Sequence, residues 1–151
     1  LTAADAILLP IQCEYYALEG LSMMIRLVQQ VREGGANPRL EIEGIVLTMF
    51  DQRTNLSNQV VQQVVEHFSD KVYETVIPRS IRVSEAPSYG QPVLVYDRNC
   101  TGTTAYRALA REFIKRENAR NGAPVPEESA PVAEATPEAA PPTPAPEPPA
   151  S

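Results

Sequence analysis

The sequence predicts an α/β fold in which a parallel sheet is flanked by helices and followed by a disordered tail. Short apolar runs alternate along the chain with longer segments whose apolar residues recur every three or four positions. A strand, helix, strand, helix, strand order is typical of parallel sheets with right-handed crossovers. The composition then changes sharply, so we expect a folded part over residues 1–117 and a tail over residues 118–151.

The first half of the folded part is expected to contain two strands and the helix between them. Residues 5–11 (DAILLPI) form a continuous apolar run, which suits a strand buried on both faces. Residues 42–50 (IEGIVLTMF) form a second such strand. The helix between them ends at the glycine pair 34–35. Its apolar positions are Leu18, Leu21, Ile25 and Val28.

The second half begins with a helix over residues 54–68, for which Thr54 and Asn55 are candidate capping residues. Residues 71–78 (KVYETVIP) suit a third strand, and residues 92–97 (PVLVYD) suit a short extended segment. A last amphipathic helix follows. The apolar stripes of the two helices are Leu56, Val60, Val64 and Phe68, and then Tyr106, Leu109, Ala110 and Phe113.

The tail differs from the rest of the chain in composition and charge. Residues 121–151 hold ten of the 15 prolines and five glutamates, and they contain no Lys, Arg or aromatic residue. Such a segment buries too little apolar surface to offset its ordering entropy, so we expect it to be disordered. All 13 Lys and Arg lie before it, against 14 acidic residues, so an anionic partner is compatible with the folded part.

The composition excludes several classes of site. Cys13 and Cys100 are too few and too far apart to indicate a disulfide framework or a metal site. His67 lies within a helical pattern and has no partner motif, so we expect it to be structural or solvent-facing rather than catalytic. Glu14 and Glu19 are five residues apart and do not form a paired acid and base. We therefore predict no catalytic residue and no metal site, and a cytoplasmic protein.

Polar residues follow all three expected strands. The strand ends read PIQCE at 10–14, TMFD at 48–51 and IPR at 77–79. In open parallel sheets, ligands bind beyond the carboxyl ends of the strands. These segments are therefore the expected ligand edge, although ordinary strand-to-helix turns would have a similar composition.

Four segments together resemble the carboxyl-terminal half of ParA/Soj-type chromosome-partitioning ATPases, which are deviant Walker A, P-loop NTPases. They are PIQCEYYALEGL (10–21), TMFDQRTNLSNQV (48–60), VIPRSIRVSEAPSYGQPV (76–93) and YDRNCTGTTAYRALARE (96–112). The chain is similar, more distantly, to MinD relatives. The resemblance implies the carboxyl-terminal half of a P-loop NTPase-like sheet, with an exposed first strand where the other half is missing.

The resemblance also implies roles for individual residues. Met49, Pro78 and Arg79 would contact adenine, although Pro78 could equally be a proline that ends a strand. Gln12 and Glu14, at the exit of the first strand, would face the nucleotide or the partner subunit. Tyr15 and Tyr16, next in the chain, are expected to be packing residues.

Two further arginines would belong to a basic surface that binds DNA regardless of its sequence. Arg53 and Arg82 match the positions that carry this role in the family. The alternative is that Arg53 braces the following helix and that Arg82 pairs with Glu85, three residues on.

The resemblance implies that the parent protein uses ATP and Mg²⁺ as cofactors and forms a homodimer in the ATP state. Its implied partners in the cytoplasm are nucleoid DNA and a centromere-binding ParB-type protein. No glycine precedes Lys-Ser or Lys-Thr, so the chain lacks a Walker A loop. We interpret the chain as an amino-terminally truncated fragment of a chromosomal or plasmid system, with a genuine half-length protein as the alternative. We expect the isolated chain to be inactive and to bind no cofactor. A non-enzymatic binding module and a MinD-like membrane-associated ATPase are alternatives, although anionic lipid would repel the acidic tail.

Overall fold

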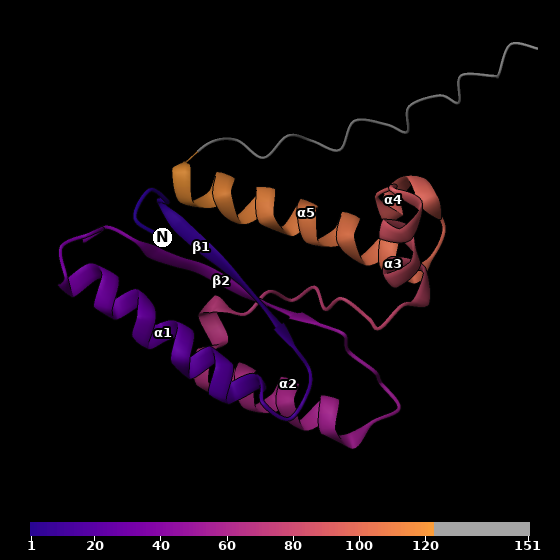
Figure 1. Ribbon diagram of the computed structural model, residues 1–151, viewed down its shortest axis with the longest axis horizontal. Helices are drawn as coiled ribbons and strands as arrows, with labels where there is room; N and C mark the ends of the chain where they lie inside the picture. The colour runs from indigo at the N-terminus through magenta and orange to yellow at the C-terminus, as the bar shows by residue number, and fades with distance from the viewer. Residues whose placement is uncertain (123–151) are drawn as a thin grey trace, which may run out of the picture.

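The computed structural model describes residues 1–122, which form a small sheet with helices on both sides (Figure 1). The two strands and the helix expected in the first half, and the helix expected over residues 54–68, are confirmed. In chain order the elements are β1 (Ala6–Gln12), α1 (Ala17–Glu33), β2 (Glu41–Thr48), α2 (Asn55–Phe68), the 3₁₀ turn η1 (Ser69–Lys71), α3 (Ile81–Glu85), the 3₁₀ turn η2 (Ala86–Tyr89), α4 (Val93–Tyr96) and α5 (Thr101–Asn121). The tail expected over residues 118–151 lies outside the described residues from 123 onward.

The strands β1 and β2 are parallel neighbours, as expected for strands joined by a helix. Their register runs from Ala6 opposite Glu41 to Gln12 opposite Thr48, with one irregularity between Ile7 and Leu8. Helices α1 and α2 lie on one side of the sheet and α5 lies on the other (Figure 1). The parallel pairing places the carboxyl ends of both strands at the same edge.

Two apolar clusters hold these layers together. The larger lies between the sheet and the helices α1 and α2, and the smaller lies beneath α5, where Ala105 and Leu109 pack on it. The buried residues of the larger cluster are Leu9, Ile11, Cys13, Leu21, Ile45, Leu47, Val60, Val64 and Val72, and those of the smaller are Val46, Tyr73 and Ile77. Buried apolar side chains of this size each contribute about 1.5–3 kcal/mol.

The third strand expected over residues 71–78 is wrong. This segment runs parallel to β2, but it meets β2 and the loop after it in only two isolated bridges, Val72 with Ile45 and Pro78 with Phe50. Between the bridges, the carboxylate of Glu112 on α5 accepts hydrogen bonds of 2.8 Å from the backbone N–H groups of Glu74 and Thr75. Because a side chain satisfies these amides, the ladder is interrupted there.

Helix α5 is fastened to this segment by further polar contacts. The guanidinium of Arg116 lies 4.2 Å from the centre of the Tyr73 ring and donates a 2.8 Å hydrogen bond to the carbonyl of Val72. The Tyr73 hydroxyl lies 3.4 Å from Glu43, whose carboxylate also pairs with Arg120. The α5 helix continues to Asn121, so the expected boundary after residue 117 falls within it.

The extended segment expected over residues 92–97 is also wrong, because residues Val93–Tyr96 form the short helix α4. The Thr103 hydroxyl lies 3.1 Å from the carbonyl oxygen of Val93 and 2.7 Å from that of Asp97. This buried threonine at the start of α5 therefore ties down both ends of α4, and local contacts override the strand-like composition.

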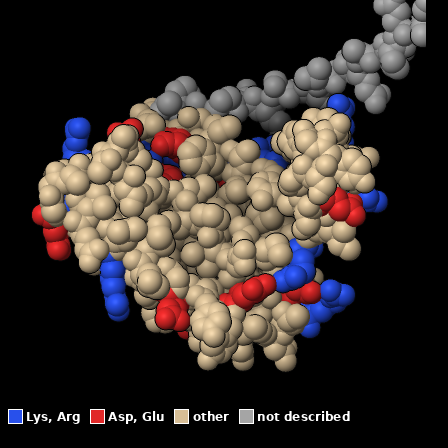
Figure 2. Space-filling view, in the orientation of Figure 1, with Lys and Arg blue, Asp and Glu red and all other residues tan. Residues whose placement is uncertain are grey.

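The outer edge of β1 is unpaired within residues 1–122, as expected. Exposure alternates along the strand. Leu9 and Ile11 are buried, whereas Leu8 is 37% exposed and Pro10 is also exposed. The strand is therefore covered on one face, and the expectation of burial on both faces is wrong for the described chain. In the view of Figure 2, most charged side chains lie toward the rim and few lie over the middle.

Candidate functional site

A cleft of about 1070 Å³ opens at the carboxyl ends of β1 and β2, where the helices α1 and α2 begin. It lies at the edge where the sequence predicts a ligand. Its lining includes four of the predicted site residues, Gln12, Glu14, Arg53 and Arg79. The other lining residues are Pro10, Ile11, Cys13, Tyr15, Tyr16, Ala17, Gly20, Asp51, Thr54, Leu56 and Ser57.

The floor of the cleft is built by hydrogen bonds between the strand ends and α2. The N–H of Cys13 donates to the carbonyl of Thr48 over 2.9 Å, which continues the sheet pairing beyond β1. The hydroxyl of Ser57, near the start of α2, donates to the Cys13 carbonyl over 3.2 Å. Burial raises the pKa of the Cys13 thiol to about 11, so this cysteine stays protonated at neutral pH and is not a nucleophile.

The start of α2 is fixed by a side-chain cap, and the capping role expected for Thr54 is confirmed. The Thr54 hydroxyl accepts a 3.3 Å hydrogen bond from the N–H of Ser57 and lies 3.1 Å from the carbonyl oxygen of Asp51. Asn55 is the first residue of the helix and not its cap. The cap holds the helix and the Asp51 loop together at the rim of the cleft.

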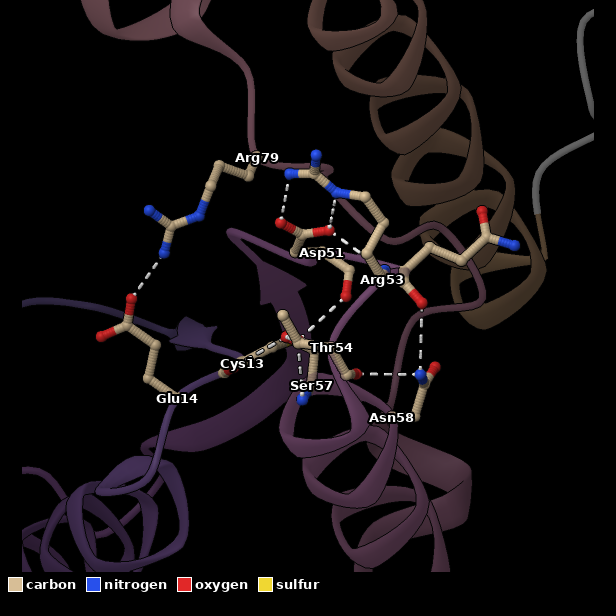
Figure 3. A network of polar contacts seen from close by, with 9 residues as sticks. Cys13, Glu14, Asp51, Arg53, Thr54, Ser57, Asn58 and Arg79 are labelled. Atoms are coloured by element: carbon tan, nitrogen blue, oxygen red, sulfur yellow. Dashed lines mark hydrogen bonds and ion pairs between the residues drawn. The ribbon is translucent and has the colours of Figure 1, made fainter.

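The first of two ion pairs at the cleft joins Asp51 and Arg53 in a fork (Figure 3). Arg53 donates to the two carboxylate oxygens of Asp51 over 3.0 and 2.8 Å, and its backbone N–H donates over 3.1 Å. These hydrogen bonds lower the pKa of the Asp51 carboxyl to about 2. The side chain of Arg53 is nevertheless 87% exposed, so its outer face is open to an anionic partner.

The second ion pair joins Glu14, which follows β1, to Arg79, which follows the extended segment beside β2 (Figure 3). Their charged atoms are 2.8 Å apart. Arg79 is brought there by its backbone N–H, which donates to the carbonyl of Phe50 over 2.9 Å. The cleft is thus spanned by a pair whose members come from two distant parts of the chain.

The remaining predicted nucleotide-contacting residues, Met49 and Pro78, lie beside the cleft but not among its described lining residues. Met49 has a φ of 55°, in the left-handed region that few residues other than glycine adopt. It therefore marks a sharp change in chain direction directly after β2. Pro78 is bridged to Phe50, the residue after Met49, so the two predicted residues lie on adjoining segments.

Arg82 lies on α3, and the described structure does not place it with Arg53 among the residues that line the cleft. It pairs with Glu85 over 3.1 Å and with Asp97 over 3.5 Å. The pairing with Glu85 is the contact considered as the alternative to a DNA-binding role. Arg82 is still 55% exposed, so the pair is open to competition by other anions.

Two tyrosines expected to be packing residues are instead exposed at the cleft. Tyr15 and Tyr16 are 76% and 73% exposed, and their rings meet edge to face with centroids 5.1 Å apart. They fall between the end of β1 and the start of α1, where no regular element directs a side chain inward. That position between two elements is the sequence signal that could have identified them as surface residues.

The cleft does not by itself fit a nucleoside triphosphate with a metal ion. Both of its arginines are already paired with carboxylates, and residues 1–122 contain no cluster of three His, Cys, Asp or Glu side chains that could hold a metal. Phosphate cradles are instead built from backbone N–H groups of a Gly-rich loop and a lysine. The residues present suit the uncharged parts of a nucleotide or a protein surface.

Comparisons with known proteins identify the family of the chain. Residues 4–93 match the family described as the CobQ/CobB/MinD/ParA nucleotide binding domain. The chain is 59% identical over 120 residues to the chromosome partitioning protein ParA of Caulobacter vibrioides. It is 53% identical over 112 residues to the sporulation initiation inhibitor protein Soj of Bacillus subtilis.

A solved structure shares the fold. The cobyrinic acid a,c-diamide synthase of Mycobacterium smegmatis, with bound ADP and magnesium, matches with a TM-score of 0.57 and 26% identity. That match covers 86% of this chain and 45% of the synthase.

The two sequence relatives cover most of this chain but are much longer than it. The matches span 80% of the chain for ParA and 74% for Soj, yet only 45% and 44% of those proteins. This chain therefore corresponds to less than half of each relative. The match to the family over residues 4–93 and the high identity to the partitioning proteins place the chain in the CobQ/CobB/MinD/ParA nucleotide-binding family, as a ParA/Soj-type member.

Proposed function

We propose that this chain is the carboxyl-terminal part of a ParA/Soj-type partitioning ATPase, and that its cleft faces the nucleotide and the partner subunit. The observation that carries the proposal is that the ends of β1, β2 and the extended segment beside β2, at Glu14, Asp51 and Arg79, converge on one cleft (Figure 3). In parallel sheets this edge is the usual place for a ligand. Gln12 and Glu14 lie on its β1 side and Arg79 on its β2 side.

Met49, Pro78 and Arg79 are the proposed adenine contacts. The left-handed backbone of Met49 and the bridge between Phe50 and Pro78 hold two adjoining segments beside the cleft. Adenine needs hydrogen-bonding groups and an apolar surface but no charge. The fixed backbone geometry of this corner, beside the cleft, supports that assignment.

The triphosphate and Mg²⁺ of the proposed parent protein require residues that this chain does not contain. The sequence has no Gly-Lys-Ser or Gly-Lys-Thr, and its only lysines are Lys71 and Lys115, on η1 and α5. Adenine contacts cannot replace the charge neutralisation that a phosphate loop supplies. We propose that a preceding half of the protein supplies that loop, and that this chain alone does not hydrolyse ATP.

DNA binding is assigned to Arg53 and Arg82, whose exposed guanidinium groups would exchange a carboxylate for a DNA phosphate. Such exchange is plausible chemistry because exposed ion pairs are weak. A ParB-type protein and a second copy of the chain are the further proposed partners, at the nucleoid and in the cytoplasm. Within residues 1–122, no helix combines the length and the apolar character needed to cross a bilayer.

A second candidate function is that of a non-enzymatic binding module. The specific observation that favours it is the exposed pair Tyr15 and Tyr16 beside arginines that are already neutralised by carboxylates. Exposed aromatic residues of this kind are enriched in protein interfaces. In this case the cleft would receive a protein segment rather than a nucleotide.

One experiment separates the two functions. The part of Caulobacter vibrioides ParA that precedes the matched region is fused to this chain, and binding of Mg-ATP is measured by calorimetry for the fusion and for the chain alone. We expect binding and turnover only for the fusion. Turnover by the chain alone, or a cooperatively folded fusion that binds no Mg-ATP, would contradict the proposed ATPase function.

A further inference from the structure

The outer face of α5 carries a stripe of three cations, Arg107, Arg111 and Lys115, which we call the α5 stripe. They are spaced four residues apart, so they lie along one side of the helix over about 12 Å. All three are exposed, and within residues 1–122 none of them forms an ion pair or a side-chain hydrogen bond. Like charges at this spacing repel one another and destabilise a helix.

The acidic residues of α5 cannot relieve this repulsion, because both are engaged elsewhere. Glu112 pairs with Arg116 and accepts hydrogen bonds from the backbone of residues 74 and 75. Glu117 pairs with Arg120, which also pairs with Glu43. The α5 stripe is therefore a basic surface that lacks an anionic partner among the described residues.

The sequence that follows α5 has the complementary charge. Residues 123–151 contain five glutamates and no Lys, Arg or Asp. The glutamates are Glu127, Glu128, Glu134, Glu138 and Glu147. This segment begins directly after Gly122, at the carboxyl end of the helix that carries the stripe.

The length of the intervening chain permits contact. Lys115 lies about 10 Å back along the helix from Gly122, at 1.5 Å per residue. Glu127 and Glu128 follow Gly122 by five and six residues, which can span up to about 16–20 Å. Glu134 can similarly reach Arg107, about 22 Å back along the helix, because twelve residues span up to about 40 Å. A short tether of this kind corresponds to a local concentration in the millimolar range.

We propose that the glutamates of residues 123–151 bind the α5 stripe and so act as an internal competitor for any polyanion that approaches this face. The contact consists of several weak, exchanging ion pairs rather than one fixed geometry. Ile114, which is 50% exposed and follows Arg111 by three residues, adds an apolar surface for the prolines and alanines of the segment. The inference does not depend on nucleotide or DNA binding.

The chain offers a direct test because it has only two lysines. A zero-length carbodiimide reagent joins a carboxylate to an amine that touches it, and mass spectrometry then identifies the joined peptides. Residues 121–151 contain no Lys or Arg, so trypsin releases all five glutamates in one peptide. We expect this peptide to be coupled to Lys115 and not to Lys71. When ¹⁴N-labelled and ¹⁵N-labelled protein are mixed before coupling, the joined peptides should carry the same label, which shows that the contact forms within one chain.

Tethering alone would also favour Lys115, so a second comparison is needed. The double variant Arg107→Gln, Arg111→Gln keeps Lys115 but removes the rest of the stripe, and coupling should fall about fivefold, as for the loss of two exposed ion pairs. The matched control is Arg26→Gln, Arg53→Gln, which changes the net charge equally at exposed sites on α1 and at the cleft and should leave coupling unchanged. Equal coupling in all three proteins, or undiminished coupling in 1 M salt, where the screening length is about 3 Å, would overturn the proposal.

Discussion

Arg79 donates a 2.8 Å hydrogen bond to Glu14 although 65 residues separate the two in the chain. Both side chains are about half exposed, at 51% and 53%. Exposed ion pairs contribute only about 0.2–1 kcal/mol, so this pair adds little to the stability of the fold. It links the end of β1 to the segment beside β2 across the cleft.

The first prediction follows from that weakness. Arg79→Ala and Glu14→Gln should each lower the free energy of unfolding by less than about 1 kcal/mol, with a coupling energy of about 0.2–1 kcal/mol in the double variant. Urea unfolding of the four proteins measures this. In the fusion with the ParA half, Arg79→Ala should weaken Mg-ATP binding. An Arg79→Ala fusion that is destabilised by clearly more than about 1 kcal/mol but binds Mg-ATP with unchanged affinity would reverse the assignment.

The second prediction concerns Glu112 and its pH dependence. Burial by itself raises the pKa of this carboxyl, but hydrogen bonds from Thr75 and Glu74 and the charge of Arg116 lower it overall from its ordinary value of 4.5. Because the folded-state pKa is depressed, the stabilisation is complete above about pH 4.5 and is lost as the pH falls through the lower folded-state value.

Glu112→Gln should therefore cost about 1.5–3 kcal/mol at pH 7, as expected for hydrogen bonds to a charged group, and progressively less in acid. Chemical unfolding at a series of pH values gives the difference. Glu117→Gln, on the same helix but in an exposed pair with Arg120, is the control and should change stability by under about 1 kcal/mol. A pH-independent difference would show that the charge of Glu112 is not the cause.

The third prediction concerns the fork between Asp51 and Arg53. The hydrogen bonds from Arg53 depress the Asp51 pKa from 3.8 to about 2. Arg53→Gln should therefore return the Asp51 pKa toward 3.8, as measured by carbon NMR of the carboxyl group during a pH titration. The stabilisation from this pair is present above pH 3.8 and is lost between there and pH 2. If the pKa of Asp51 does not change in the variant, the Arg53 side chain is not the cause of its lowered value.

The fourth prediction tests the DNA role of Arg53 and Arg82 in the fusion protein. Replacing either with alanine should weaken DNA binding equally on any sequence, because phosphate contacts do not read bases. The slope of log affinity against log salt concentration should also fall by about 0.9 for each phosphate contact that is lost. Asp51→Asn frees Arg53 from its carboxylate and should strengthen binding. Binding isotherms at several salt concentrations decide this. If both alanine variants keep the DNA affinity and its salt dependence unchanged, Arg53 and Arg82 have no DNA-binding role and only form ion pairs with Asp51 and Glu85.

The fifth prediction concerns the close packing of β2 under Tyr73. A Cβ atom at Gly44 would lie 2.4 Å from Cε2 of the buried Tyr73 ring and 2.9 Å from the carbonyl oxygen of Lys71. Gly44→Ala should therefore destabilise the protein by about 1–3 kcal/mol in thermal or urea unfolding. Gly20→Ala is the control, because a Cβ at that α1 position meets no atom within 4 Å. It should stabilise the helix by about 0.5–1 kcal/mol, and equal effects would contradict the packing argument.

The first half of the fold could be predicted from local pattern, because β1, α1, β2 and α2 each have the periodicity of their final structure. The errors fell where distant side chains determine the backbone. The segment 71–78 has the composition of a strand, but Glu112 on α5 takes up two of its amides. The segment 92–97 forms a helical turn because Thr103 contacts both of its ends. Neither contact can be read from a window of neighbouring residues.

The position of the candidate site could also be predicted, because strand ends of a parallel sheet meet at one edge. Gln12, Glu14, Arg53 and Arg79 do line one cleft. The ion pairs of Arg79 with Glu14 and of Arg53 with Asp51 could not be predicted from the sequence. The partner of Arg79 is remote in sequence, and Asp51 lies two residues before Arg53 in a loop whose geometry depends on the Thr54 cap.

The proline in β1 has a consequence for how the open edge of the sheet can be completed. The N–H of Cys13 points to β2, and N–H groups of successive residues in a strand point to opposite edges, so the nitrogen of Pro10 faces outward. Proline has no N–H to donate, which leaves a gap in the row of donors along this edge. An incoming strand therefore forms its best ladder only in registers that place no acceptor opposite Pro10. Pro10 thus restricts the register in which another strand can pair with β1, and it makes edge-to-edge pairing of two copies of β1 less favourable.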